Sequence, residues 1–217
     1  MTKEEKSTLR KFKIYKDYLG VGCDIYKKAT ITLKPGVTIL AGCNGMGKTT
    51  LIRQLIDKLK SQNAHILSFD NLHDGGQNAR SWAGFRGDFS FLATSAFSSE
   101  GENIQMNLGN FAGRIGDFCR FNRDSEDLWI FMDSIDSGLS IDNVVEVKDM
   151  CKQIIEICGR NRSVYIIISA NLYEFARDED CFDVYRGKYI RFKSYEKYRE
   201  FILKTRQEKD NRVYDDE

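Results

Sequence analysis

The sequence predicts an α/β fold with a mainly parallel sheet flanked by helices and an antiparallel β layer near the N-terminus. Apolar runs typical of buried strands alternate with segments whose apolar residues recur at helical spacing; the runs lie at residues 37–41, 64–69, 128–132 and 164–168. A glycine-rich loop follows the first run, and a carboxylate, Asp133, ends the third. Parallel strands that alternate with helices bring their carboxyl ends to one edge of the sheet, where ligands of such folds bind.

The β layer is predicted from residues 12–33, which are rich in β-branched and aromatic residues and are broken by Gly20 and Gly22. Tyrosines in this region have two interpretations that the sequence leaves open. They stack on a nucleotide base, or they cover one face of the sheet.

The later elements follow from the same patterns. Apolar residues at three-to-four spacing predict helices over residues 101–120 and 141–158, and two short runs around Gly187 predict a hairpin. Ser194 is a suitable N-cap for a last helix that we expect to end near residue 209.

Length and composition indicate one domain. The 217 residues suffice for a single large domain, which we place at 11–209, between a flexible segment at 1–10 and a flexible acidic tail at 210–217. The formal net charge of +1 gives no global basic excess of the kind that marks many nucleic-acid-binding proteins.

The six cysteines show no C-x-x-C spacing, so neither a zinc site nor a disulfide framework is expected. The N-terminal region is charged and lacks an apolar run of signal-peptide length. No segment has the roughly 18 continuous apolar residues that a membrane span requires. We therefore expect a cytoplasmic protein.

The most specific motif is the glycine-rich loop at residues 42–50, which fits G-x-x-x-x-G-K-[ST]. Glycines allow successive backbone N–H groups to point at phosphate oxygens, and the helix that follows adds positive potential at its N-terminus. The predicted binding residues are Gly42, Cys43, Asn44, Gly45, Met46, Gly47, Lys48, Thr49 and Thr50. We expect a P-loop NTPase in which Lys48 contacts the β- and γ-phosphates and the Thr49 hydroxyl binds Mg²⁺. Asp133, at the tip of its strand, is the expected second Mg²⁺ ligand.

Three stretches resemble ATP-binding-cassette (ABC) ATPases. Residues 31–51 resemble the strand, loop and helix that begin that family, and residues 131–140 resemble its Walker B and D-loop run. Residues 99–102, Ser-Glu-Gly-Glu, are similar to its signature motif in the S-x-G-E form. That form is typical of soluble chromosome-maintenance and recombination ATPases and of predicted ATPases of phages and mobile elements. The resemblance covers residues 30–172 and implies an ABC-ATPase head-like fold.

The resemblance also implies a partner. In ABC proteins the signature faces the ATP held by a second subunit, which gives Ser99 and Gly101 that role in an ATP-dependent homodimer. A simpler reading, which is compatible with the first, makes Ser99 a helix N-cap that pairs with Glu102. Thr50 and Ser99 lie only 49 positions apart, which leaves no room for a long coiled-coil arm.

Three positions matter for hydrolysis. The family has a glutamate directly after the Walker B aspartate, whereas this chain has Ser134; Asp136 is the carboxylate nearest to replace it. The family's switch histidine corresponds to Ala170, and the neighbouring Asn171 can bond a phosphate but cannot accept a proton as a base does. Gln77 lies where the family has a glutamine that senses Mg²⁺. The catalytic candidates are thus Lys48, Asp133, Asp136 and Asn171, and the metal candidates are Thr49, Gln77 and Asp133.

Three function classes remain open. The first is an ATPase head that uses ATP·Mg²⁺ to drive or switch a protein partner, with DNA processing as a candidate role and nucleic acid as a candidate partner. The second is a nucleotide or small-molecule kinase. The third is a regulatory subunit that binds nucleotide and hydrolyses it poorly, a class favoured by Ser134 and Ala170.

Overall fold

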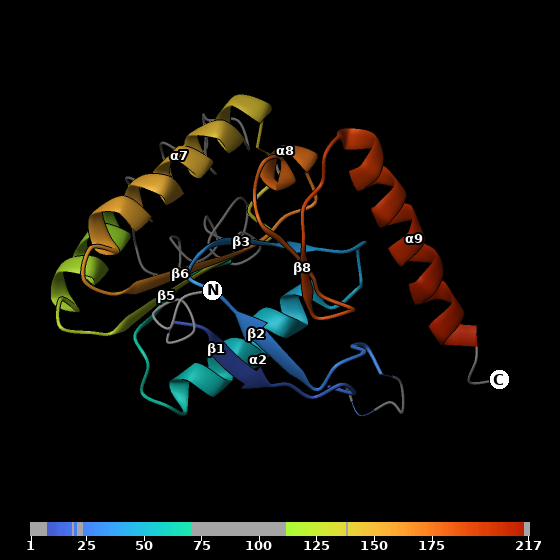
Figure 1. Ribbon diagram of the computed structural model, residues 1–217, viewed down its shortest axis with the longest axis horizontal. Helices are drawn as coiled ribbons and strands as arrows, with labels where there is room; N and C mark the ends of the chain where they lie inside the picture. The colour runs from blue at the N-terminus through green and yellow to red at the C-terminus, as the bar shows by residue number, and fades with distance from the viewer. Residues whose placement is uncertain (1–7, 19, 21–23, 71–111, 138, 215–217) are drawn as a thin grey trace, which may run out of the picture.

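The computed structural model describes residues 8–18, 20, 24–70, 112–137 and 139–214, with side chains as far as residue 212. Its centre is a six-stranded sheet in the order β4-β5-β6-β3-β7-β8 (Figure 1). The strands are β3 (Gly36–Ala41), β4 (Ile66–Asp70), β5 (Asp127–Asp133), β6 (Ser163–Ser169), β7 (Cys181–Asp183) and β8 (Lys188–Ile190). All neighbours in this sheet are parallel except β7 and β8, which form the predicted hairpin.

A second, two-stranded sheet pairs β1 (Arg10–Lys13) with β2 (Thr30–Leu33) in antiparallel register. The fold class predicted from the sequence is therefore confirmed: a P-loop α/β fold with a mainly parallel sheet and an N-terminal antiparallel layer. The antiparallel layer is shorter than the strand-like stretch over residues 12–33 suggested. The described residues between 14 and 29 form no strand.

Helices cover both faces of the large sheet (Figure 1). They are α2 (Lys48–Lys60), α7 (Ile141–Cys158), the four-residue α8 (Tyr173–Ala176) and α9 (Tyr195–Tyr214), and residues 112–121 are also helical. Alternation along β5 explains the two layers. Leu128, Ile130 and Met132 belong to the apolar cluster that contains α7 residues, whereas Trp129 and Phe131 belong to the cluster that contains α2 residues.

The antiparallel sheet packs in the α2 layer. Phe12 of β1 meets the Trp129 ring edge-on at 5.4 Å between centroids, and Trp129 stacks on Tyr165 of β6 at 3.9 Å. These rings are almost fully buried, so the apolar residues near the N-terminus complete a core that the large sheet alone leaves open.

Two expectations need correction. The last helix runs to Tyr214 rather than ending near residue 209. Its final turns are held by Arg206, which pairs with Asp210 at 3.0 Å, and by Arg212, which donates to the carbonyl of Ile25. The cysteine spacing gave no reason to expect a disulfide bond, yet Cys119 and Cys158 form one. The fold brings together the ends of two helices that are far apart in the sequence.

The register sets the position of the site. Leu40 of β3 pairs with Ser169 of β6, and Met132 of β5 pairs with Ile168. The carboxyl ends of β3, β5 and β6 therefore meet at one edge, which carries the glycine-rich loop, Asp133 and the segment that starts at Ala170. In the part of the chain that the structure describes, no helix is both long enough and apolar enough to cross a membrane.

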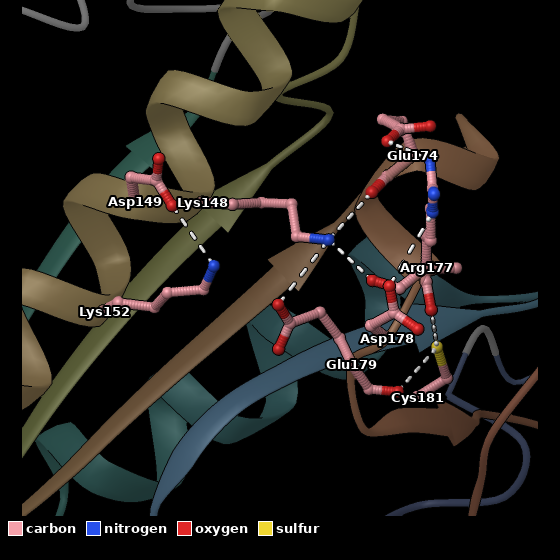
Figure 2. A network of polar contacts seen from close by, with 9 residues as sticks. Lys148, Asp149, Lys152, Glu174, Arg177, Asp178, Glu179 and Cys181 are labelled. Atoms are coloured by element: carbon pink, nitrogen blue, oxygen red, sulfur yellow. Dashed lines mark hydrogen bonds and ion pairs between the residues drawn. The ribbon is translucent and has the colours of Figure 1, made fainter.

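Lys148 of α7 fastens the segment that follows this edge (Figure 2). Its Nζ donates to the backbone carbonyls of Glu174 at 3.0 Å and Arg177 at 2.6 Å, and it lies 3.5 Å from a carboxylate oxygen of Glu179. The side chain is only 13% exposed. One largely covered ammonium group thus contacts three acceptors around α8.

We expect Lys148→Met to lower the free energy of unfolding by about 1–3 kcal/mol, because two backbone carbonyls and a carboxylate lose a charged donor. Urea denaturation measures the effect. Lys152→Met is the matched control, since Lys152 lies one turn further along α7, is 62% exposed and pairs with the similarly exposed Asp149. The control should change stability by no more than about 0.5 kcal/mol, and equal effects of the two substitutions would contradict this role for Lys148.

A candidate nucleotide phosphate site

The glycine-rich loop adopts a conformation that its glycines make accessible. Gly42 and Gly47 both have positive φ, 155° and 97°. A Cβ on Gly47 would lie 3.1 Å from the Tyr26 hydroxyl oxygen, and one on Gly42 would lie 3.0 Å from Cγ of Met46. At both positions a side chain would be crowded by its neighbours, and the positive φ also favours glycine.

Lys48, the first residue of α2, points its ammonium group back into the loop. Its Nζ donates to the carbonyls of Gly42 at 2.8 Å and Cys43 at 3.3 Å, and to Oδ1 of Asn171 at 2.9 Å. The residue is 7% exposed. Burial lowers the pKa of Lys48, and attraction to Cys43, Asp136 and Asp133 partly opposes that shift. A buried cation held by neutral acceptors is well placed to bind an anion.

Two of the three predicted Mg²⁺ ligands, Thr49 and Asp133, are adjacent. Thr49 Oγ1 donates to Oδ1 of Asp133 at 3.2 Å, and Asp133 is 5% exposed. Within the described residues, no group of three or more His, Cys, Asp or Glu side chains is placed to hold a metal. One hydroxyl and one carboxylate suit Mg²⁺, which usually takes one or two carboxylates and completes its shell with waters and phosphate oxygens. These residues therefore fit the expected ion.

Asp136 holds the Asn171 loop. Its Oδ2 accepts the backbone N–H groups of Asn171 at 2.5 Å and Leu172 at 2.8 Å. The Tyr198 hydroxyl of α9 donates to the carbonyl of Asn171 at 2.6 Å. Asn171 is thereby fixed at both backbone groups, with its amide oxygen on Lys48. Ala170 is buried in the apolar cluster that contains α7 residues, so Asn171 is the residue after β6 that reaches the loop.

A cavity of about 220 Å³ lies over these groups. Its lining includes Lys48, Thr49, Ser134, Ser169 and Asn171. Ser134 has φ of 53°, in the left-handed region that non-glycine residues seldom adopt. Such strain commonly accompanies functional positions, and here it falls where the sequence departs from the glutamate of the family it resembles.

Two residues that support the backbone of the glycine-rich loop were not predicted from the sequence. The Tyr26 hydroxyl donates to the carbonyl of Gly47 at 2.7 Å, and Thr205 Oγ1 of α9 accepts the N–H of Cys43 at 3.1 Å. Tyr26 is 1% exposed and Thr205 is fully buried. Tyr26 thus supports the loop backbone with its hydroxyl, whereas Tyr15 and Tyr18 remain exposed. No local pattern marks Thr205, because its partner lies 162 positions away.

Three predicted site residues cannot be placed. Gln77, Ser99 and Gly101 lie outside the residues that the structure describes, so their roles as metal sensor and signature motif stay predictions.

Comparisons with known proteins leave the family of this chain open. No protein-family model matches it, and no curated protein matches it by sequence. One solved structure that it resembles is an ATP-binding cassette of an ABC transporter in its ADP conformation. The identity is 14% and the TM-score 0.48, over 88% of this chain and 93% of the other. Because likeness at this level does not carry function, the function has to follow from the site itself.

Proposed function

We propose that this chain is an ABC-type ATPase head that binds ATP with Mg²⁺ and hydrolyses it slowly, as a switch for a partner. The single observation that carries the proposal is the convergence of Lys48, Thr49 and Asn171 on one cavity at the carboxyl edge of the sheet, with Asp133 hydrogen-bonded to Thr49 beside it. A positioned ammonium, a hydroxyl paired with a carboxylate, and a glycine loop at a helix N-terminus are the parts that a nucleoside triphosphate requires.

The binding step follows from the contacts of Lys48. We expect its ammonium to exchange the carbonyls of Gly42 and Cys43 for oxygens of the β- and γ-phosphates, since charge-assisted hydrogen bonds are the stronger ones. Thr49 and Asp133 would hold Mg²⁺, which neutralises phosphate charge when bound. The loop N–H groups and the N-terminus of α2 complete the anion site.

The residues that the strand order places beside the phosphate loop support slow hydrolysis. Because β6 lies between β3 and β5, Asn171 is delivered between the loop and Asp133. An amide there can orient a phosphate or a water but cannot remove a proton. Asp136, the other carboxylate of the group, uses one oxygen to accept two backbone N–H groups, which favours a positioning role over that of a base.

The partner part of the proposal rests on the resemblance of residues 99–102 to the ABC signature. We propose an ATP-dependent homodimer in which Ser99 and Gly101 face the partner's nucleotide. The dimer would act on a further protein and, as a candidate, on nucleic acid.

A kinase remains the second candidate function, because the phosphate site alone does not distinguish transfer of the phosphoryl group to water from its transfer to another acceptor. Adding ATP·Mg²⁺ while measuring oligomeric mass and phosphate release together, with and without DNA, separates these functions.

We expect ATP·Mg²⁺ to double the mass of the wild-type protein and Ser99→Arg to prevent this while ATP affinity is retained. The sequence predicts that Ser99 begins a helix, where a cation would oppose the helix dipole and would occupy the space of the partner's phosphate. Light scattering and a nucleotide titration measure the two properties. Ser61→Arg is the control, since Ser61 is exposed at the C-terminal end of α2, where a cation is favourable. A dimer unaffected by Ser99→Arg, or constant mass with ATP bound, would argue against the signature role.

A further inference from the structure

A second polar cavity lies at the opposite edge of the sheet from the phosphate loop. Its volume is about 530 Å³, and it is formed by the helix at residues 112–121, the connector that leads into β5, and the segment between α7 and β6. Asp127 and Ser163, the first residues of β5 and β6, mark this edge as the amino edge. Four arginines line the cavity: Arg120, Arg123, Arg160 and Arg162.

Arg162 is built into the floor of this cavity. Its Nε donates to the carbonyl of Cys158 at 2.8 Å, its Nη2 to the carbonyl of Cys119 at 3.0 Å, and its Nη1 to the carbonyl of Asn122. These carbonyls belong to the ends of two helices, which the disulfide bond between Cys119 and Cys158 also joins. The segments that carry the four arginines are therefore held together covalently and by hydrogen bonds.

Among the residues that the structure describes, little negative charge compensates the arginines of this cavity. Arg123 and Arg160 are exposed, and neither forms an ion pair within the part of the chain that the structure describes. Arg120 pairs with Asp117 at 3.1 Å, but both side chains are more than half exposed, so the pair is weak. Among the described lining residues, Asp124 is the one acid against four arginines. Burial lowers the pKa of Arg162, and repulsion from Arg123 lowers it further.

Helix capping explains part of this arrangement. A cation near helix C-termini is favourable, and the three carbonyl contacts of Arg162 meet that need. Capping does not explain why Arg123 and Arg160, from the two joined segments, line the same cavity without a described acidic partner. Two guanidinium groups that line one cavity, on segments joined by a disulfide bond, fit a ligand with several anionic oxygens.

We propose that this cavity is a binding site for phosphate groups of a ligand that carries two or more of them. The planar donor fork of arginine matches phosphate oxygens in pairs, which makes arginine the residue suited to such recognition. The phosphates belong to a small polyphosphorylated molecule or to a nucleic-acid backbone, which present the same chemistry to the arginines. The proposal is independent of the nucleotide site, because the two sites lie at opposite edges of the sheet and can be filled together.

The test measures binding of inorganic pyrophosphate and, separately, of a single-stranded DNA oligonucleotide. The full chain carries Lys48→Met, so that the phosphate loop does not contribute. Adding Arg123→Gln with Arg160→Gln should weaken binding at least about tenfold, the expected loss for charge-assisted hydrogen bonds. For the oligonucleotide, the slope of log K against log salt concentration should also fall by about 1–2.

The control is Arg53→Gln with Lys58→Gln, which removes the same charge from exposed positions of α2. An arginine-dependent loss for pyrophosphate supports the site and assigns it to a small molecule, and a loss confined to the oligonucleotide supports it and assigns it to a nucleic-acid backbone. Binding of neither probe overturns the proposal. Equal weakening by the control pair, or no weakening by the arginine pair, also overturns it. Circular dichroism checks that all variants are folded.

Discussion

Lys48→Met is expected to weaken ATP binding about 100-fold or more, since the ammonium is the cation that the loop offers to the phosphates. Because Lys48 is buried, we expect its substitution to change ATP binding much more than stability. Removing a buried charge relieves the desolvation that lowers its pKa, while the carbonyls of Gly42 and Cys43 lose a donor. These effects oppose each other, so we expect stability to change by no more than about 1–2 kcal/mol. Titration with a fluorescent ATP analogue and a urea melt measure the two quantities.

Lys58→Met provides the control, because Lys58 lies in the last turn of the same helix and is exposed. It should leave ATP affinity unchanged. ATP affinity of the wild-type level in folded Lys48→Met protein would remove the basis for placing the nucleotide in this loop. It would leave the arginine cavity untouched, which separates failure of the two proposals.

Local patterns predicted the elements that carry the site. β3, β5 and β6 are continuous apolar runs because both faces of a central parallel strand are buried, and such runs are visible without a structure. The glycines, Lys48 and Thr49 form a motif of fixed spacing, and Asp133 follows its strand directly. The alternation of strands and helices implies a parallel sheet, but the adjacency of Thr49 and Asp133 also requires β6 to lie between β3 and β5, a strand order that the structure supplies.

Long-range contacts were the part that the sequence could not predict. Thr205 reaches Cys43 from α9, and Lys148 reaches the backbone around α8, through hydrogen bonds to main-chain atoms that any residue type possesses. The hydrogen bonds of Arg162 to three backbone carbonyls are of the same kind, whereas the disulfide between Cys119 and Cys158 depends on where two helices end. Backbone donors and acceptors leave no complementary side chain in the sequence to search for.

Ser134 is where the second large effect is expected, because under the proposed function a carboxylate at this position would supply a general base to the site. Ser134→Glu should raise the rate of ATP hydrolysis by about 10²-fold or more, within the ~10²–10⁴-fold that positioned proton transfer typically contributes. The backbone at Ser134 is already left-handed, with φ of 53°, so glutamate would replace another non-glycine residue in the same conformation. The neighbouring charge of Asp133 would raise the pKa of the new carboxyl group and so strengthen it as a base.

Ser134→Gln is the matched control, since glutamine has the size of glutamate but cannot accept the proton. Phosphate release at saturating ATP should increase for the glutamate variant alone, with ATP affinity similar in both.

Asp136→Asn tests the competing hypothesis that Asp136 already activates water. If Asp136 only holds the loop of Asn171, its amide variant should retain the slow rate, whereas a base at this position would make hydrolysis collapse while ATP still binds. Rapid turnover of the wild type that survives Asp136→Asn would contradict both versions. The oligomeric mass of Asp136→Asn must also be measured with ATP by light scattering. Loss of the dimer with normal ATP binding would assign Asp136 to a contact between subunits.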